Sequence, residues 1–576
     1  MSTTVEQGLS RRRFIRNAGL AAAAAWLPTF VVRPGTALAE AGPAGFPSNV
    51  ELYRQAYENW TGEIHVDDAW TCAPRTPTDV VAVVNWARAN GYRIRPQGMR
   101  HGWSPLTVAN ETPADARFLL VDTTRHMTAM ALSREHPSAV DVQTGALMTS
   151  LLEFLEGHGL GFTAVPSCGE ISVGGALAIN AHGASLPARG ESTAGRTYGS
   201  LSNRVLALTA VVWDPVAGVY ALRRYDRRDP QTKALMTHLG RAFITDVTLQ
   251  AGPNDNLRCI SLTDIPALEL FAAAGSPGRT FETFLDRAGR VEAIWFAFTP
   301  KPWLKVWFPS ARKPSRSRSV SGPYNYPFAD NVPQPIPDIA ERIMADDASL
   351  TPLLGETMYE ATVAGLHAFD ATDLWGPSKD LLLYVKPSTI PERHSSLAVL
   401  TRRSEVQRVL HDYAVQFQTM LASYRSRGLY PINLGVELRV SGIDHPTDVP
   451  IAGAEPPSLS TVSPSRDHPE WDTAVWLSTL TLPGTPSAGE FGTELEAWIS
   501  SHYTAQGAGV RPEWSKSWAY TNEGPWRNTN MIRREIPDAF GSGSGPGDEW
   551  RSAIATFDEL DPPRIFSNTF LDTLLV

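Results

Sequence analysis

The pattern of apolar and polar positions divides residues 76–250 into alternating helices and strands. Four apolar residues share the spacing of one helix face: Val80, Val81, Val84 and Ala87. Thr76-Pro77 fits an N-cap with proline in the first turn, and Asn90-Gly91 fits the helix end. The pattern therefore predicts a helix over 76–90, followed by a strand over 92–96.

Shorter apolar runs in this region predict four more strands, over 118–122, 139–143, 205–213 and up to about 249. A helical pattern also begins near Met148, reaches His158 and stops at Gly159. The preceding residues, 40–75, are interpreted as a lead-in that contains one short amphipathic helix. That helix would be capped by 46–49 and end near Tyr57.

The later part of the chain shows both the helical and the strand spacing of apolar residues. Ser404–Tyr424 has the apolar stripe of a long helix that would cover a sheet. Residues 435–440 alternate, so Glu437 and Arg439 project from the opposite strand face to the intervening valines and leucine. Two stretches rich in Pro, Ser and Arg, 309–323 and 454–469, predict exposed loops, one of which would suit a lid.

The length and the first residues change this picture in two ways. A chain of 576 residues exceeds what one hydrophobic core usually serves, so at least two domains are expected. Residues 1–39 combine a run of arginines at 11–13, an apolar stretch over 18–27 and a small-residue site at 37–39. This order predicts a twin-arginine export signal, and the apolar stretch is shorter than the roughly 20 residues of a membrane anchor. We expect the protein to be secreted.

Charge and cysteine content restrict the partners. Without residues 1–39 the chain loses five arginines and one glutamate and has a net charge of −13, which argues against nucleic acid. Only Cys72, Cys168 and Cys259 are present, too few for a disulfide framework or a metal cluster. We expect no metal site, and we expect stability to come from core packing.

Two glycine-rich segments contain the first candidate chemistry. Residues 95–106 place His101 between Gly98 and Gly102 directly after a strand, where glycines with φ > 0 would let backbone amides converge on a phosphate. A surface turn that happens to hold a histidine is the alternative on these residues alone. The second segment, 166–183, opens onto a helical run and suits a helix N-terminus facing phosphates. The region contains no Walker loop and no dinucleotide G-x-G-x-x-G motif.

Three motifs together resemble the flavin-binding domain of the vanillyl-alcohol oxidase superfamily. They are R-P-x-G-x-x-H-G at 95–102, P-S followed by I-S-V-G-G-A-L-A-x-N-x-H-G at 166–183, and Y-G-S-L-S-N at 198–203. The resemblance implies an FAD cofactor that is attached covalently to His101 through the flavin 8α position. It also implies that His182 shapes the flavin pocket, whereas His65, His126, His136 and His238 are interpreted as surface or capping residues.

The resemblance extends the cofactor site to a wider set of residues. Its expected members besides His101 are Arg95, Pro96, Gly98, Met99, Arg100, Gly102, Trp103, Ser104, Pro166, Ser167, Ser172, Gly174, Gly175, Asn180, His182, Gly183, Gly199, Ser200, Asn203, Ile244 and Asn568. Asn568 belongs to a segment, 561–568, that resembles the family's returning D-P-x-x-x-F-x-N motif.

The same resemblance implies an α+β, two-domain flavoenzyme. Residues 40–255 and 536–576 would form a discontinuous FAD-binding domain. Residues 256–535 would form an inserted substrate-binding domain, in which helices cover an antiparallel sheet.

Two segments resemble the catalytic face of alditol-type and sterol-type oxidases. Glu437 and Arg439 match an E-x-R strand that lies over the flavin, although by themselves they would suit an exposed ion pair. Residues 511–516 match R-P-x-W-x-K, which brings Lys516 to the cofactor. The sugar-alcohol branch commonly has histidine where this chain has Glu513, which makes a polyol substrate less expected.

A third segment is more specific. Glu292 lies in an aromatic run over 291–303, where a glutamate needs a partner if it is buried and would otherwise stand at a strand edge. With 321–328 and the E-x-R strand, this run resembles the FAD-linked, type II bacterial cholesterol oxidases over almost the whole mature chain. Tryptophans and a phenylalanine of the insertion would line an apolar cavity, although such residues are more often ordinary core: Trp295, Trp303, Trp307, Phe308, Trp375, Trp476 and Trp518.

The resemblance implies an exported oxidase that converts 3β-hydroxysterols to 3-keto-4-ene steroids and reduces O2 to H2O2. Glu292 would be the base of both the oxidation and the Δ5-to-Δ4 isomerisation, Arg439 the electrostatic stabiliser oriented by Glu437, and Lys516 the charge beside the flavin. The expected partners are sterol and O2, with transient membrane-surface contact and a monomeric state. An alditol or sugar-lactone oxidase, a dehydrogenase with another electron acceptor and a carrier without turnover remain alternatives.

Overall fold

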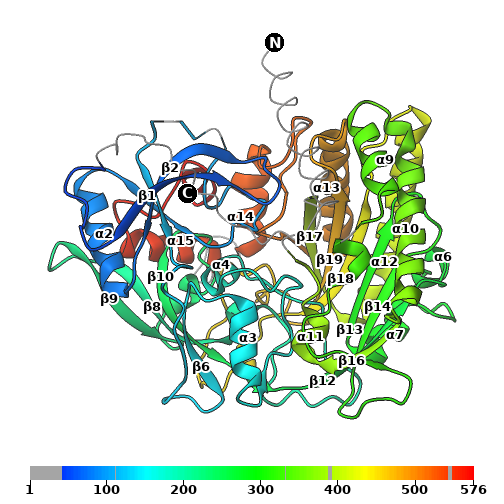
Figure 1. The fold of residues 1–576 in the computed structure, drawn as a ribbon, viewed down its shortest axis with the longest axis horizontal. Helices are drawn as coiled ribbons and strands as arrows, with labels where there is room; N and C mark the ends of the chain where they lie inside the picture. Colours follow the sequence, from blue (N-terminus) through cyan, green and yellow to red (C-terminus); the bar gives the residue numbers. More distant parts are fainter. Residues whose placement is uncertain (1–41, 111, 114, 331, 387–391, 542–547) are drawn as a thin grey trace.

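The computed structural model describes residues 42–110, 112–113, 115–330, 332–386, 392–541 and 548–576. The predicted export signal lies outside these residues. The N-terminal part of the chain and its last helices gather on one side, and the central part forms the other side (Figure 1).

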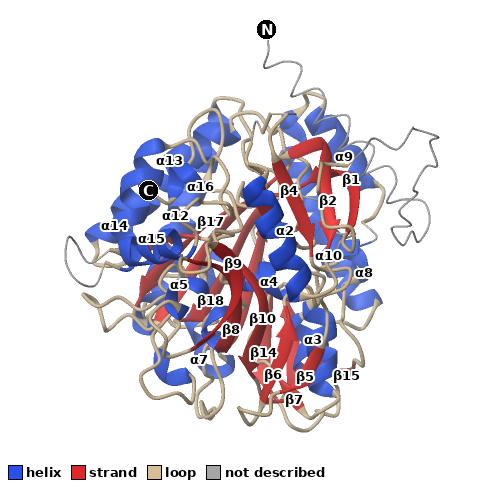
Figure 2. Ribbon diagram, turned by 90° about the vertical axis from the view of Figure 1, so that its left-hand side faces the viewer, coloured by secondary structure: helices blue, strands red, loops and turns tan. Residues whose placement is uncertain are grey.

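The N-terminal side contains two larger sheets and one small strand pair (Figure 2). The four-stranded sheet has the order β1 (Glu51–Glu58), β2 (His65–Ala73), β4 (Phe118–Asp122), β3 (Arg93–Gln97). The five-stranded sheet has the order β5 (Met130–Leu132), β6 (Ala139–Gln143), β10 (Phe243–Gln250), β8 (Val205–Asp214), β9 (Val219–Asp226). The small pair is β7 (Leu160–Gly161) with β11 (Gly252–Pro253).

Helices of this side follow the predicted pattern closely. α2 (Pro77–Ala89) is capped by Thr76, whose hydroxyl accepts a hydrogen bond from the Asp79 N–H, and it ends at Asn90. α3 (Met148–Glu156) and α4 (Val173–Ala178) also lie where the apolar spacing predicts them. α5 (Thr232–Leu235) is a single turn before β10.

The interpretation of residues 40–75 was wrong. Residues 51–58 form β1 instead of a helix, and β1 pairs antiparallel with β2 along most of its length. Leu52, Ala56 and Tyr57 have helical spacing, but the pairing with β2, a strand that the sequence pattern did not reveal, decides the backbone conformation.

The central part of the chain builds one nine-stranded sheet. Its order is β15 (Arg318–Ser319), β16 (Asp373–Pro377), β12 (Asn256–Leu262), β14 (Trp303–Pro309), β13 (Arg290–Phe296), β18 (Gly435–Gly442), β19 (Thr473–Thr481), β17 (Arg393–Thr401), β20 (Gly509–Pro512). Its neighbouring strands are antiparallel except for β15 and β16, which are parallel.

Helices cover the outer face of this sheet (Figure 1). The helices of the central part are α6 (Ala267–Leu270), α7 (Phe281–Ala288), α8 (Pro327–Asp330), α9 (Pro335–Met344), α10 (Thr351–Ala368), α11 (Ser378–Leu382), α12 (Val406–Ser426) and α13 (Ala488–Ala505). The apolar residues of β18, Val436, Leu438 and Val440, share one core cluster with Phe417 of α12. Glu437 and Arg439 consequently face the opposite, N-terminal side.

The last residues return to the N-terminal side (Figure 1). α14 (Ile536–Phe540), α15 (Glu549–Leu560) and α16 (Leu571–Leu574) precede the chain end. The carbonyl of Ile565 accepts a hydrogen bond from the Ile94 N–H of β3, and the buried Asp561 binds Tyr220 and Arg241. The segment 561–568 therefore lies directly behind the loop that follows β3.

One of the two predicted surface loops, 454–469, is exposed only in part. Residues 457–463 are buried, and Thr461 donates a hydrogen bond to the Pro512 carbonyl while Arg511 binds the carbonyls of Thr461 and Ser463. Proline and serine content predicts loop structure correctly here, but it does not predict that this loop packs against β20.

Among the described residues no helix is long and apolar enough to cross a membrane.

Candidate active site

A deep pocket lies between the N-terminal side and the nine-stranded sheet. Four segments form its wall: the loop after β3, residues 166–182, residues 238–244 and residues 513–516, with Arg439 of β18. Most predicted cofactor residues are on this wall: Arg95, Pro96, Gly98, Met99, Arg100, His101, Gly102, Trp103, Ser104, Pro166, Ser167, Ser172, Gly174, Gly175, His182 and Ile244. Of the predicted catalytic residues, Arg439 and Lys516 are there as well.

Arg95 fixes the loop after β3. Its buried guanidinium donates to the carbonyls of Leu106 and Thr107 within the loop, of Gly240, and of Phe566 in the returning segment. The donors are therefore used on backbone carbonyls of this chain. Burial, and to a lesser degree the charge of Arg241, lowers the pKa of Arg95 to about 9.

The two glycines of the loop do not adopt the expected φ > 0. The left-handed residue is Arg100, with φ 58°. Gly98 is required by close approach instead, because a Cβ there would stand 2.2 Å from Ser172 Oγ. A Cβ at Gly102 would meet no atom within 4 Å, since this residue borders the pocket.

The loop presents backbone donors to the pocket. Within the described chain, the N–H groups of residues 98–102 donate no hydrogen bond to protein acceptors, whereas Trp103 and Ser104 donate to the Ser515 carbonyl. Successive free amides on a pocket wall are suited to the oxygen atoms of an anionic or carbonyl-rich ligand. The loop thus fits the FAD that its motif implies.

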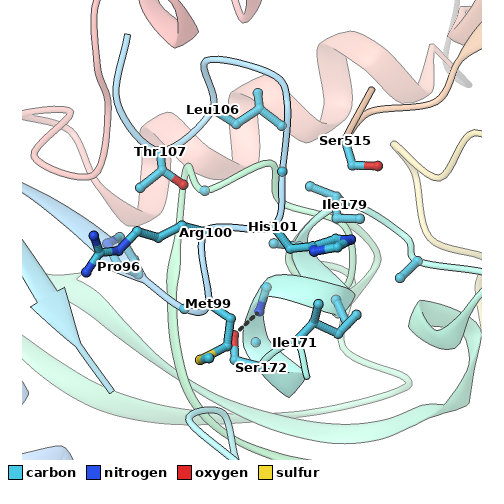
Figure 3. A pocket seen from close by; sticks show the side chains of 18 of the residues that line it. Pro96, Met99, Arg100, His101, Leu106, Thr107, Ile171, Ser172, Ile179 and Ser515 are labelled. Carbon is cyan, nitrogen blue, oxygen red and sulfur yellow. Dashed lines mark hydrogen bonds between the residues drawn. The ribbon is translucent and has the colours of Figure 1, made fainter. Parts of the chain in front are cut away.

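His101 projects from this loop beside Ile179, with Ser515 of the opposing segment nearby (Figure 3). Its ring lies 4.3 Å from the Trp60 ring and 5.5 Å from the Trp103 ring, and Nδ1 is 3.9 Å from Cys168 Sγ. Burial, assisted by the charge of Lys516, lowers the pKa of His101 to about 3. The imidazole is therefore neutral at physiological pH and keeps one nitrogen lone pair free for bonding.

The second glycine segment supports the first. Ser172 caps α4 by accepting the Gly175 N–H (Figure 3). Its hydroxyl fills the space that Gly98 leaves open. The N–H of Gly174 donates to the Thr144 carbonyl. α4 has only six residues. Any contacts of the cofactor with its N-terminus are therefore limited to this short turn and the loop that faces it.

Six predicted cofactor residues do not line this pocket. Ser200 donates from its N–H and its hydroxyl to Asp444, and a Cβ at Gly199 would collide with the same carboxylate. Asn203 donates to the His445 carbonyl, and Asn180 accepts from Thr461. Gly183 lies against the Val165 backbone, and Asn568 donates to the carbonyls of 105–107. These residues hold the wall from behind.

His238 is placed differently from the surface role expected for it. It is 6% exposed and lines the pocket, and its Nδ1 accepts the Gly240 N–H. The turn-capping part of the expectation therefore agrees with the structure, and the surface part is wrong. Burial, together with the charge of Arg95, lowers the pKa of this histidine to about 3.

Strand register brings the acidic and basic side chains together on the inner sheet face. Glu292 of β13 is paired directly with Lys305 of β14 on one side and with Arg439 of β18 on the other. Directly paired residues point to the same face, so the three side chains form a row across three strands. Glu292 is 1% exposed and central in the sheet, which excludes the strand-edge interpretation.

Both carboxylate oxygens of Glu292 contact neighbouring donors. The Tyr384 hydroxyl lies 2.6 Å from each of its carboxylate oxygens, and Lys305 Nζ forms an ion pair with it. Burial alone would raise the pKa of Glu292, but Lys305, a hydrogen bond with Glu437 and Arg439 together lower it to about 2. Burial and the neighbouring charge of Glu292 raise the pKa of Glu437 to about 8, against the effect of Arg439. At neutral pH this pair of carboxylates holds one proton.

Arg439 lies between two carboxylates without a close hydrogen bond to either. Its Nη2 is 3.6 Å from Glu437 Oε2 and 3.7 Å from Glu513 Oε2. Nε and Nη2 have no hydrogen-bond partner among the described residues, although the side chain is only 9% exposed. A buried guanidinium with free donors on the pocket wall is available to a ligand oxygen.

Glu513, the residue that departs from the sugar-alcohol pattern, is buried beside His182. Their nearest atoms are 3.5 Å apart, and the His182 ring stacks on Trp476 at 3.5 Å. Burial opposes ionisation of Glu513, but His182 and Arg439 outweigh it and hold its pKa well below the ordinary value. His182 therefore lies on the pocket wall between Glu513 and Trp476.

Sequence reasoning missed three members of this network. They are Lys305, Tyr384 and His394; the last has Nδ1 3.1 Å from Lys516 Nζ and Nε2 3.3 Å from Glu437 Oε2. The available signal was a lysine within the aromatic strand 303–308. No local pattern indicates Tyr384 or His394, because strand pairing and a distant loop bring them to the site.

The tryptophans of the insertion divide between core and site. Trp295 and Trp518 belong to the helix-covered core cluster, as the ordinary-core alternative holds. Trp303 and Trp307 lie on the inner face in another cluster, where both rings stand near Lys305. The inner face therefore combines apolar rings with the charged row.

Taken together, the fold, the amide-lined loop and the buried acid–base row define an FAD-dependent oxidoreductase. Residues 69–214 match the FAD binding domain family, and residues 256–576 match the family described as cholesterol oxidase, substrate-binding. The second match covers more than half of the chain, which therefore belongs to the cholesterol oxidase family.

Solved structures agree with this assignment. A solvent-stable cholesterol oxidase is 49% identical with a TM-score of 0.91, and covers 93% of this chain and 100% of its own. A cholesterol oxidase from Brevibacterium sterolicum is 45% identical with a TM-score of 0.90, over 93% of this chain and 99% of its own. Berberine bridge enzyme from Eschscholzia californica, at 12% identity and a TM-score of 0.51 over 87% and 88% of the two chains, shares the fold alone.

A curated relative matches only part of the chain. D-2-hydroxyglutarate dehydrogenase from Haemophilus influenzae is 29% identical over 143 residues, which is 24% of this chain and 12% of that protein. The chain thus spans a small part of that relative's length.

Proposed function

We propose that this protein is an exported flavoprotein oxidase that converts 3β-hydroxysterols to 3-keto-4-ene steroids and reduces O2 to H2O2. The observation that carries the proposal is the row Lys305–Glu292–Arg439, buried beside the FAD pocket in a chain of the cholesterol oxidase family. The pocket wall with residues 95–104 would hold FAD, which would supply an acceptor for the carbinol hydride and a route for the electron pair to O2. The steps below concern this chain's own side chains.

Oxidation of an alcohol requires removal of the hydroxyl proton. Glu292 is the ionised carboxylate of the row, and its neighbour Glu437 carries the proton that the pair holds at neutral pH. Arg439, with unused donors, stabilises the negative charge that develops on the substrate oxygen. Glu437 and Glu513 hold the guanidinium between them.

The isomerisation uses the same carboxylate. A 3-ketone acidifies the C4–H bond, whose electron pair moves toward the ketone oxygen as Glu292 takes the proton. Return of the proton to C6 completes the Δ5-to-Δ4 shift, with no net oxidation. One carboxylate suffices because Glu292 holds the proton taken from C4 and then gives that proton to C6.

Lys516 supplies positive charge at the cofactor wall. Its ammonium lies 3.6 Å from the Trp103 ring centroid and 3.1 Å from His394 Nδ1. Burial lowers its pKa to about 8, so that the side chain is mainly charged at neutral pH. Charge here favours transfer of electrons into the flavin.

We infer that His101 carries FAD through a bond to the flavin 8α carbon. A neutral, buried imidazole on the cofactor wall supports this inference, because bond formation needs an unprotonated nitrogen. Residues 1–39 direct export, and the protein acts as a monomer that contacts membranes transiently for sterol uptake.

The substrate is tested by peroxide release from the purified holoenzyme. Cholesterol should give H2O2, whereas xylitol and gulonolactone should not. Peroxide from a sugar substrate alone would establish the alditol or lactone oxidase alternative. Flavin that cholesterol bleaches but air does not restore would indicate a dehydrogenase, and absence of bleaching would indicate a carrier.

The covalent attachment is tested with His101→Ala. Acid-precipitated wild-type protein should be yellow and the variant colourless, because the variant lacks the attached nitrogen. His238→Ala is the matched control, since His238 lines the same pocket and should leave the precipitate yellow. A yellow His101→Ala precipitate would place the link on another residue.

A further inference from the structure

Lys305 is a fully buried lysine with one ion-pair partner in the described chain. The side chain has 0% exposure, and its ammonium contacts the carboxylate of Glu292. Four aromatic rings surround the ammonium as well: Tyr384 at 3.4 Å, Trp303 at 4.8 Å, Trp307 at 5.6 Å and Tyr326 at 6.0 Å from the ring centroids. A lysine is almost never fully buried unless its charge is paired, as that of Lys305 is with Glu292.

We propose that Lys305 is a positioning residue that keeps Glu292 ionised and fixed in orientation, and so sets the pH range in which Glu292 moves the steroid proton. The proposal rests on the proposed function, because it concerns the base of that reaction. It assigns a role that neither the motifs nor the family match provides.

The orientation follows from the geometry around the carboxylate. Tyr384 donates toward both carboxylate oxygens, and the same tyrosine ring is the nearest aromatic face to Lys305. Lys305, Tyr384 and Glu292 therefore form a closed triangle, in which displacement of one side chain disturbs the other two. The backbone pairing of β14 with β13 fixes the positions of Lys305 and Glu292 relative to each other.

The charge balance explains the ionisation. Glu292 is faced by Lys305 from β14, by Glu437 and Arg439 from β18, by Tyr384 from the segment after α11, and by Cys259 from β12. Of the two cations, Arg439 is shared with Glu437 and Glu513, whereas Lys305 is paired with Glu292 alone among the described residues. Without Lys305, the buried carboxyl groups of Glu292 and Glu437 would depend on one shared guanidinium.

The expected consequence is a shift of the pH profile. Loss of an opposite charge in direct contact raises the pKa of a carboxyl group by about 1–3. Glu292 is then protonated over part of the range in which the wild type is ionised. Because proton abstraction requires the ionised form, the rising limb of the pH–rate profile moves to higher pH.

Isomerisation of 5-cholesten-3-one by the holoenzyme is the appropriate reaction, because it involves proton transfer without electron transfer. Lys305→Met keeps the chain length and removes the charge. We expect its rising limb to lie about 1–3 pH units above that of the wild type, so that kcat is reduced at acidic pH and KM is little changed. Lys301→Met, in the connection between β13 and β14 and with no ion pair to Glu292 among the described residues, should match the wild type.

Glu292→Gln separates the two levels of the argument. If this variant isomerises normally, the proposed role of Glu292 fails. If it is inactive at every pH while the profile of Lys305→Met equals that of the wild type, only the role of Lys305 fails.

A second measurement does not require the Lys305 variant to fold. Difference infrared titration of the wild-type holoenzyme, with Glu292→Gln to assign the band, reports the ionisation of Glu292 directly. We expect a carboxylate band that persists to acidic pH. A protonated carboxyl band at neutral pH would overturn the proposal.

Discussion

Lys516 shows how the ionisation of one side chain can limit the pH range of the site. It is buried between Trp103 and His394, and burial is the largest cause of its lowered pKa of about 8. The ammonium is charged below that pH and neutral above it. Its charge at the cofactor wall is therefore lost within a range that enzymes readily tolerate.

We expect turnover to fall as the pH rises through about 8, because the lost charge no longer favours electron transfer into the flavin. Lys516→Arg keeps the charge to higher pH and should abolish this fall, whereas Lys516→Met should be slow at every pH. The measurement is kcat with cholesterol between pH 6 and about 10. Identical falling limbs in wild type and Lys516→Arg would show that another group titrates.

The same shift affects folding stability with a definite sign. An unfolded lysine retains its proton up to about pH 10.4. Between about pH 8 and that value, the unfolded state binds more protons than the folded state, so this residue's contribution to stability rises with pH.

Local patterns predicted some residues of the site and could not predict others. Strand alternation placed Glu437 and Arg439 on one strand face, the resemblance assigned them to the site, and His101 came from a motif of eight residues. Lys305 and His394 depend on which strands pair and in what register, which no window of the sequence contains. The φ > 0 position was assigned to the glycines of the loop, although Arg100 adopts it, because steric freedom alone does not fix where a loop turns.

At the scale of elements, the loop after β3 and the start of α4 fit each other through one missing side chain. Ser172 caps α4 with the hydroxyl that occupies the space beside Gly98. The loop cannot approach α4 this closely if residue 98 has a Cβ. The cap of one element and the position of the other are thus coupled.

Gly98→Ala should consequently displace either the loop or the serine. We expect a loss of about 1–3 kcal/mol in stability, as for overpacked sites, together with reduced FAD content. Gly102→Ala is the control, because its Cβ would meet nothing within 4 Å, and it should change stability by less than about 0.5 kcal/mol. Thermal unfolding and the ratio of flavin to protein absorbance measure both effects; equal behaviour of the two variants would contradict the fit described here.

Elements with strong local signals were predictable, and those fixed by distant partners were not. α2 and α12 were confirmed because caps and apolar stripes lie within each helix. β1 was predicted as a helix because its short sequence allows both periods and its partner β2 was not recognised. The buried course of 457–463 depends on contacts with β20, about 50 residues away.

At the scale of the whole molecule, the C-terminal segment ties the cofactor loop to the five-stranded sheet. Asp561 binds the fully buried Arg241 and the Tyr220 hydroxyl, and its carboxylate also accepts the N–H groups of Ile565 and Phe566. Three residues later in the chain than Ile565, Asn568 binds the carbonyls of 105–107. The expected division into discontinuous domains stays a prediction, but these contacts give the chain end a clear structural role.

Asp561→Ala should therefore destabilise the protein strongly. Removal of one partner leaves the Arg241 guanidinium, 1% exposed, with the half-exposed Asp558 as its one ion-pair partner among the described residues. Breaking a buried pair costs about 3–5 kcal/mol. Urea unfolding measures the loss, and limited proteolysis should cut the released C-terminal segment. Asp347→Ala removes an exposed pair with Arg342 and should cost less than about 1 kcal/mol.

The row across β14, β13 and β18 also constrains how the gene for such a protein can change. Each strand contributes one charged residue, and alternate positions of the same strands face the helix-covered core. A single codon gained or lost within one strand would turn its charged residue toward the helix-covered core and its apolar residues toward the steroid. Insertions and deletions should therefore accumulate in the connections between strands, while the lengths and the register of the strands are preserved.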